Sequence, residues 1–147
     1  MKINIKRFDK SLPIPKVDPK TAGFDFVCRE SVIIKPQKIV GVAVNTAVRI
    51  TQGYFLMIAA RSSTSWKKGI LLANGVGIVD PFYSGDMDEI KILLLNITNK
   101  PVRVEKGELL AQGILLKNEL VEWIEVNSFG TVGHGGYSMK DTQKKSN

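Results

Sequence analysis

Residues 54–97 read YFLMIAARSSTSWKKGILLANGVGIVDPFYSGDMDEIKILLLNI, and this stretch decides the fold. Short apolar runs at residues 54–60 and 90–97 open and close it, and both contain β-branched or aromatic side chains. Runs of this length, bounded by glycine and proline, are typical of β-strands. Between them, residues 62–69 predict one short helix, with hydroxyl residues to cap its start and a glycine to end it.

The same short runs or alternations recur outside this stretch, at residues 3–5, 32–34, 40–44, 109–116 and 121–125. Helical periodicity is almost absent elsewhere in the chain. Many short strands separated by turn residues predict an all-β barrel or sandwich and argue against a βαβ fold.

The composition fits one globular domain. The chain has 147 residues, of which 44% are hydrophobic and 24% charged. Such a chain buries a core without covalent crosslinks, and its single cysteine, Cys28, excludes an intrachain disulfide. The N-terminus lacks the apolar segment of a signal peptide, and no run reaches the ~18 apolar residues of a membrane span. We therefore expect an intracellular, cytoplasmic protein with no membrane partner.

The sequence changes character from residue 128 onward. Four glycines fall within residues 130–136, and a polar tail follows. We therefore predict a compact domain over residues 1–127 and a flexible glycine-rich arm over residues 128–147. The net charge of +7 fits an anionic partner such as a nucleotide, or simply a solubilising surface, since the lysines are scattered.

The start of the predicted helix is a candidate phosphate site. Arg61, Ser62 and Ser63 combine a bidentate phosphate ligand with hydroxyl and backbone donors. A capped surface helix with a solvated arginine is the alternative.

The glycine-bearing hairpin predicted at residues 74–83 is a second candidate. Asn74 carries an amide that can read a base edge, and Asp80 lies among apolar neighbours, where a carboxylate needs partners or a function. An aspartate that closes a turn, with Tyr83 as ordinary core, is the alternative.

Two further features are compatible with ligand binding. Gln112 is polar within an apolar run, so it must find partners or face a cavity. The glycine-rich arm is not a P-loop, because no Gly-Lys-Ser/Thr occurs and no helix follows. It is either a plain tail or a lid whose backbone N–H groups wrap phosphates.

Five segments of the chain resemble, in order and spacing, the five motifs of the trimeric dUTP diphosphatases. They are TAGFDFVC (21–28), ARSSTSWKKGI (60–70), NGVGIVDPFYSGD (74–86), KGELLAQ (106–112) and FGTVGHGGYS (129–138). They span most of the chain, and the second, third and fourth are the most specific. The resemblance implies a jelly-roll-like β-barrel that forms a homotrimer, with three sites at subunit boundaries, each closed by a neighbour's C-terminal arm.

The resemblance also implies a role for each site residue. The uracil would contact Asn74, Ile78, Val79 and the backbone of Lys91, and His134 would stack on it in place of the usual phenylalanine. Tyr83 would lie under the deoxyribose and leave no room for a 2′-hydroxyl. The triphosphate would be held by Arg61, Ser62, Ser63 and Gln112, with Asp25 supporting the arginine or metal-bound water.

The reaction implied by the resemblance is hydrolysis of dUTP to dUMP and pyrophosphate. Asp80 would be the catalytic base, orienting and deprotonating a water for in-line attack on the α-phosphorus. Mg²⁺ would be held by phosphates and water, without a direct protein ligand, and would neutralise the leaving pyrophosphate.

The chain departs from the family pattern in three ways, one of which is the end of the arm, where Gly136-Tyr137-Ser138 stands in place of the usual Gly-Ser-Thr-Gly. Residues 86–89, Asp-Met-Asp-Glu, form an acidic insert that we expect to face solvent, with a direct Mg²⁺ site as the alternative. In the arm, Phe129 stands where the family has an arginine.

Three alternatives to dUTP hydrolysis can be weighed against the sequence. The dCTP deaminases share the barrel and the Arg-Ser-Ser motif, but their catalytic glutamate corresponds to Leu93 here, which cannot move a proton. A catalytically silent nucleotide-binding relative of the dUTP diphosphatases is the second. An OB-like nucleic-acid-binding module is the third; it would need aromatic residues spread over a strand face, and we expect no specific nucleic-acid partner.

Overall fold

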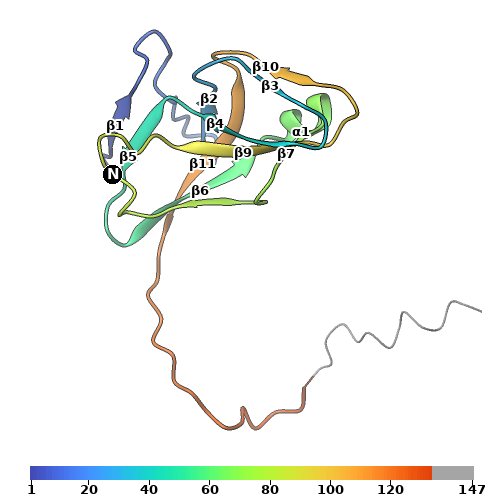
Figure 1. Cartoon of the computed structure of the whole chain (residues 1–147). Helices are drawn as coiled ribbons and strands as arrows, with labels where there is room; N and C mark the ends of the chain where they lie inside the picture. The colour runs from blue at the N-terminus through green and yellow to red at the C-terminus, as the bar shows by residue number, and fades with distance from the viewer. Residues whose placement is uncertain (134–147) are drawn as a thin grey trace, which may run out of the picture.

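The computed structural model describes residues 1–133, which form eleven β-strands and one short α-helix (Figure 1). The elements, in chain order, are β1 (Asn4–Arg7), β2 (Phe24–Val27), β3 (Val32–Ile34), β4 (Ile39–Ala43), β5 (Thr46–Arg49), β6 (Tyr54–Ala60), α1 (Ser62–Lys68), β7 (Ile70–Leu72), β8 (Gly77–Val79), β9 (Lys91–Asn96), β10 (Val102–Val104) and β11 (Leu109–Lys117).

The strands pair antiparallel and mostly with partners distant in the sequence. One sheet has the order β2-β11-β6-β8, a second has β4-β9-β7, and the pairs β1-β5 and β10-β3 complete the body. Such long-range antiparallel pairing is the arrangement of a jelly-roll-like barrel. The predicted all-β fold is therefore confirmed.

Alternate side chains of these strands fill one hydrophobic core. Strand β9 shows the pattern clearly, because Ile92 and Leu94 are buried while Leu93 between them is 43% exposed. Phe26 and Leu56 enter the same core from β2 and β6. The apolar runs predicted as strands at residues 32–34, 54–60 and 109–116 are confirmed within a residue of their observed bounds.

The helix α1 is confirmed, but its predicted cap is wrong. Arg61 is the N-cap residue, with an extended backbone and no side-chain hydrogen bond to the first turn, so the serine hydroxyls do not cap it. The C-terminal prediction holds. Gly69 ends the helix in the left-handed conformation, with φ of 63° and its N–H donating to the Ser65 carbonyl.

The turn at Asn74–Gly75 is not the predicted hairpin. Strand β7 before it pairs with β9, and strand β8 after it pairs with β6, so the turn carries the chain from one sheet to the other. Gly75 has φ of 70°, which explains the glycine. Because β8 is the last strand of its sheet order, its outer edge has no strand partner among the described residues.

The alternation at residues 121–125 does not form a strand in the single chain. After β11 ends at Lys117, residues 118–133 leave the body as an extended chain (Figure 1). Leu120, Trp123 and Ile124 are almost fully exposed there, Trp123 by 90%. The predicted division between body and arm at residues 127 and 128 stays a prediction.

Within residues 1–133, no helix is long and apolar enough to cross a membrane. Cys28 is fully buried, and burial raises the pKa of its thiol.

Candidate active site

Three of the predicted site residues are brought together by strand register. On β11, Gln112 is the cross-strand partner of Asp25 on β2 and of Ala59 on β6. Side chains two residues apart on extended chain point to the same side, so Arg61 shares the side of Ala59. Asp25, Gln112 and Arg61 therefore meet at the end of this sheet.

An ion pair joins two members of this group. The Nε atom of Arg61 lies 2.9 Å from Oδ1 of Asp25, and both side chains are about a quarter to a third exposed. The N–H does not point at the oxygen, since Oδ1 lacks a hydrogen bond of good geometry. Asp25 thus holds the arginine by charge and leaves its N–H groups available for another anion.

Two of the four predicted triphosphate residues line one open cavity of about 280 Å³, and Gln112 is not among its lining residues. Arg61 and Ser63 lie on its wall together with Lys67 and Lys68, whereas Ser62 is exposed beside them. Glu108 also lines the cavity and pairs with Lys68, so Arg61, Lys67 and the Ser63 hydroxyl are the groups that favour an anionic ligand.

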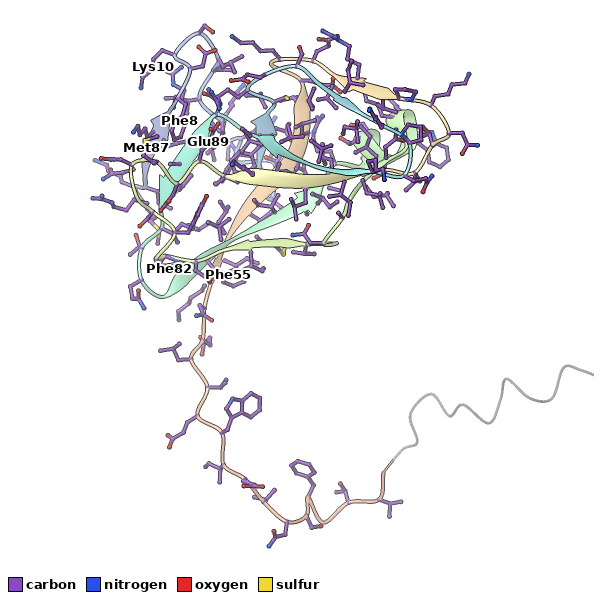
Figure 2. The ribbon with its side chains drawn as sticks, in the orientation of Figure 1. Phe8, Lys10, Phe55, Phe82, Met87 and Glu89 are labelled. Atoms are coloured by element: carbon purple, nitrogen blue, oxygen red, sulfur yellow. The ribbon has the colours of Figure 1, made fainter. Side chains whose placement is uncertain are left out.

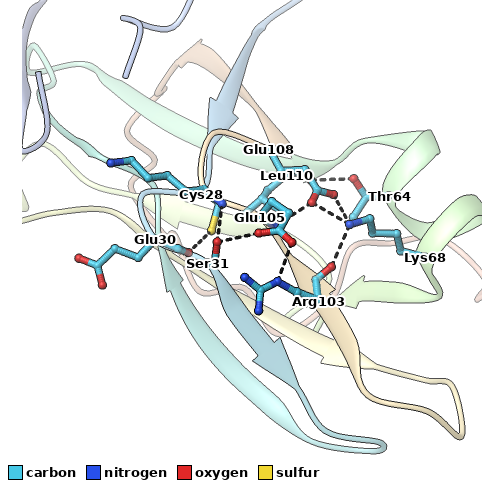
Figure 3. A network of polar contacts seen from close by, with 10 residues as sticks. Cys28, Glu30, Ser31, Thr64, Lys68, Arg103, Glu105, Glu108 and Leu110 are labelled. Atoms are coloured by element: carbon cyan, nitrogen blue, oxygen red, sulfur yellow. Dashed lines mark hydrogen bonds and ion pairs between the residues drawn. The ribbon is translucent and has the colours of Figure 1, made fainter. Parts of the chain in front are cut away.

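The helix that carries these residues is anchored to β11, to the turn before it and to β10 (Figure 3). The buried Thr64 hydroxyl donates to the Leu110 carbonyl at 3.0 Å. Lys68 Nζ lies 2.6 Å from Glu108 Oε1 and donates to the Arg103 carbonyl at 3.0 Å. Sequence reasoning missed these supporting residues. Their signal was a lysine in the last helical turn and a glutamate beside a strand, a pattern common on any surface.

A second group surrounds a separate cavity of about 290 Å³. It is lined by Ile78, Val79, Asp80, Phe82, Tyr83, Ile90 and Lys91. Asp80 is exposed at the end of β8, and its carbonyl accepts a hydrogen bond from the Tyr83 N–H at 3.1 Å. A carboxylate, a phenol ring and a strand edge therefore share one hollow. Asn74 is exposed in the preceding turn and does not line it.

The acidic insert faces solvent only in part. Asp86 and Met87 are exposed, and Asp88 accepts a hydrogen bond from the Gly85 N–H at 2.8 Å. Glu89, in contrast, is only 8% exposed, so the prediction that the whole insert faces solvent is wrong. Figure 2 shows Met87 at the outer edge of the body and Glu89 on its inner side. The buried carboxylate has partners within the body, which the sequence does not reveal.

The two groups lie far apart within one chain. Val79 pairs with Leu56, and Arg61 follows five residues later along β6. At about 3.3 Å per residue, these positions are roughly 16 Å apart. One chain therefore cannot bring Asp80 and Arg61 to adjacent phosphates. His134 lies outside the described residues, so its predicted role stays a prediction.

The fold and the two groups define an all-β protein with the features of a nucleotide-binding site. Comparison with known proteins makes this specific. The dUTPase family profile matches residues 10–140. The chain therefore belongs to the dUTPase family.

Related chains match over almost their whole length. The deoxyuridine 5′-triphosphate nucleotidohydrolase of Nautilia profundicola is 35% identical, covering 98% of this chain and 100% of the relative. The protein of the same name from Helicobacter pylori strain J99 is 31% identical, covering 98% and 99%.

Solved structures show the same fold. The crystal structure of dUTPase from Streptococcus mutans superposes with a TM-score of 0.74 at 27% identity, covering 81% of this chain and 98% of that one. A mutant dUTPase from phage phi11 of S. aureus, described as coordinating a structural Mg(II) ion, superposes with a TM-score of 0.75 at 20% identity. The match covers 88% of this chain and 99% of that one. At 20% identity the second likeness concerns the fold alone.

Proposed function

We propose that this chain is a dUTP diphosphatase, which hydrolyses dUTP to dUMP and pyrophosphate in the cytoplasm. The observation that carries the proposal is the near full-length relationship to deoxyuridine 5′-triphosphate nucleotidohydrolases. The cavity that holds Asp80 and Tyr83 at the edge of β8 supports it, because it offers a general base and a flat surface for a sugar.

The free edge of β8 is suited to reading a base. Successive residues of a strand turn their N–H and C=O groups to opposite edges, so one of the neighbours Ile78 and Val79 presents unpaired groups at the free edge, and Lys91 lines the same cavity. A strand edge with fixed donors and acceptors rejects a base that has a donor where an acceptor is needed, or the reverse. Buried polar groups of both partners would then go unpaired. Uracil would be selected over cytosine in this way, with Asn74 adding an amide and Tyr83 lying under the deoxyribose.

The other group would hold the triphosphate. Arg61 offers a charged fork, Ser62 and Ser63 offer hydroxyl donors, and Gln112 adds an amide from β11. Asp25 would keep the guanidinium oriented through the 2.9 Å ion pair. Asp80 would then orient and deprotonate the water that attacks the α-phosphorus.

The separation of the two groups supports a homotrimer with sites between subunits. A nucleotide contacts both groups only if Asp80 comes from one chain and Arg61 from another. The outer face of the β4-β9-β7 sheet supplies a surface for such assembly. Leu93 and Leu95 point outward from β9, with Ile39 and Leu71 beside Leu95, and we call these four residues the apolar sheet face. A monomer would leave this face in water.

A divalent cation fits this site without a protein cage. Residues 1–133 contain no cluster of three or more His, Cys, Asp or Glu side chains able to enclose a metal ion. We infer that Mg²⁺ would be held by the triphosphate and water, with the Asp25 carboxylate as a partner for that water. When bound, the ion would neutralise charge on the phosphates and on the leaving pyrophosphate.

The proposal is tested by measuring pyrophosphate release from dUTP, dCTP, dTTP and UTP, with and without Mg²⁺. We expect dUTP to be hydrolysed far faster than the other three and the reaction to need the metal. Tight binding of dUTP without pyrophosphate release would instead identify a catalytically silent relative.

The acidic insert is not expected to hold the metal. The Asp88 carboxylate already accepts a hydrogen bond from the Gly85 N–H, and the Lys6 ammonium, which donates to the Asp86 backbone carbonyl at 2.6 Å, places a positive charge beside the insert. The double variant Asp86→Asn with Asp88→Asn should therefore leave the Mg²⁺ concentration for half-maximal activity within about twofold of wild type. A large rise in that concentration, measured by titrating Mg²⁺ against pyrophosphate release, would assign the metal to the insert.

The C-terminal arm is expected to act as a lid. Ending the chain after residue 127 should lower dUTP hydrolysis about tenfold or more, because the backbone donors that wrap the phosphates are lost. The trimer should persist in light scattering. Ending the chain after Lys117 is the matched comparison, because it also removes the apolar side chains of Leu120, Trp123 and Ile124 and should weaken assembly. Full activity in the first variant would make the arm a plain tail.

Two rings of the arm can be compared directly. His134 is the predicted stacking residue, and Tyr137 is a larger aromatic ring three residues later. If His134 stacks on uracil, His134→Ala should raise KM for dUTP more than Tyr137→Ala does. The reverse order would move the stacking role to Tyr137.

A further inference from the structure

The buried carboxylate of the acidic insert holds two distant parts of the chain together. Glu89 Oε1 accepts a hydrogen bond from the Asn45 N–H at 2.9 Å and lies 2.8 Å from Arg29 Nε. Asn45 is fully buried in the turn between β4 and β5, and Arg29 follows β2. The insert, which we expected to be a solvated loop, is therefore tied into the body at its last residue.

The backbone on both sides of this turn is fixed as well. The Ile90 N–H donates to the Thr46 carbonyl at 2.9 Å, and the Val44 N–H donates to the Ile90 carbonyl at 3.0 Å. The Glu89 carbonyl is consequently held in place, and it accepts a hydrogen bond from the Tyr83 hydroxyl at 3.1 Å. A continuous chain of contacts thus runs from Arg29 through Glu89 to the ring of Tyr83.

We propose that Arg29 and Glu89 are positioning residues that set the height of the Tyr83 ring and so the selection of deoxyribose over ribose. This inference rests on the proposed function. Tyr83 rejects a 2′-hydroxyl only if its ring lies close under the sugar, so a small shift opens room for UTP. The tether matters because the Tyr83 side chain is otherwise 38% exposed at the cavity wall.

The arginine also provides a matched control. Its Nη1 atom lies 2.9 Å from Glu30 Oε1, and the Glu30 side chain is 74% exposed, against 9% for Glu89. An exposed pair contributes little, whereas a buried carboxylate that loses its cation must find water or move. Only the contact with Glu89 should therefore affect the ring.

The experiment compares kcat/KM for dUTP with kcat/KM for UTP in each variant. Glu89→Gln and Arg29→Met should each lower the ratio of kcat/KM for dUTP to kcat/KM for UTP about tenfold. The displaced Tyr83 ring should leave room for the 2′-hydroxyl of UTP. Tyr83→Phe, which keeps the ring but removes the tether, should lower the ratio in the same direction. Glu30→Gln should leave it unchanged.

A second variant distinguishes unfolding of the protein from displacement of the Tyr83 ring. The double variant Arg29→Met with Glu89→Gln leaves no unpaired buried charge and keeps an acceptor for the buried Asn45 N–H, so it should fold while still lacking the ion pair, and its ratio should fall too. Equal losses on both substrates, or an unchanged ratio in folded variants, would overturn the inference. A wild-type protein that does not hydrolyse dUTP would contradict the proposed function instead.

Discussion

Asp80→Asn is expected to lower kcat for dUTP by a factor on the order of 10² or more, while dUTP binding stays within a few-fold of wild type. Asparagine keeps the size and the acceptor oxygen of the side chain but cannot take a proton from water. Asp80 is also the one carboxylate among the residues that line the β8 cavity. The measurements are steady-state hydrolysis and the affinity for a non-hydrolysable dUTP analogue.

The control for this prediction is Asp86→Asn, the same change six residues later at an exposed position of the insert. It should leave kcat nearly unaltered. Turnover near the wild-type value in Asp80→Asn would remove Asp80 from the mechanism. If Asp80→Asn lowers the affinity for the analogue as much as it lowers kcat, Asp80 is a binding residue and not the base.

Leu93→Lys is expected to dissociate the proposed trimer into monomers and to lower activity by a factor on the order of 10². The substitution puts a charge in the middle of the apolar sheet face, where a subunit boundary would bury it. Because Asp80 and Arg61 are too far apart to serve one nucleotide within a chain, dissociated chains hold only incomplete sites. Light scattering and pyrophosphate release should fall together.

Met87→Lys is the matched control, since Met87 is more exposed than Leu93 but lies outside the apolar sheet face. It should remain trimeric. A fully active Leu93→Lys monomer would contradict the shared site.

Sharing of the site can also be measured without breaking the trimer. Asp80→Asn and Arg61→Ala chains should each be inactive alone, but co-refolding them in equal amounts should restore activity. About a quarter of the sites in random mixed trimers would combine an intact Asp80 from one chain with an intact Arg61 from another. No recovery on mixing would place both residues in a site within one chain.

The sequence predicted most of the body correctly, because its signals there are local. The alternation of Ile92, Leu93 and Leu94 defines β9 and its two faces, and Gly69 ends α1 because a left-handed residue is needed there. These features depend on a few neighbouring residues. Their signals can therefore be read from the sequence without knowing the distant partners.

The failures have a common cause, which is dependence on distant partners. Asn74–Gly75 has the composition of a hairpin turn, but the strands on either side find better partners in different sheets. Glu89 reads as part of an acidic loop, yet it is buried because Arg29 and the Asn45 N–H lie opposite it. The alternation at residues 121–125 has no partner strand within the described part of its own chain. Pattern and propensity do not contain this information.

The extended segment after β11 has a consequence for biosynthesis. Domains form from the N-terminus as the chain emerges from the ribosome, so the body through Lys117 can fold before residues 118–133 are free. The side chains of Leu120, Trp123 and Ile124 emerge after β11, the last strand of the described body. A product of translation interrupted after β11 would keep the described strands but lack these apolar side chains, and we expect it to compete poorly for places in the proposed trimer. The order of synthesis would thus favour assembly from full-length chains.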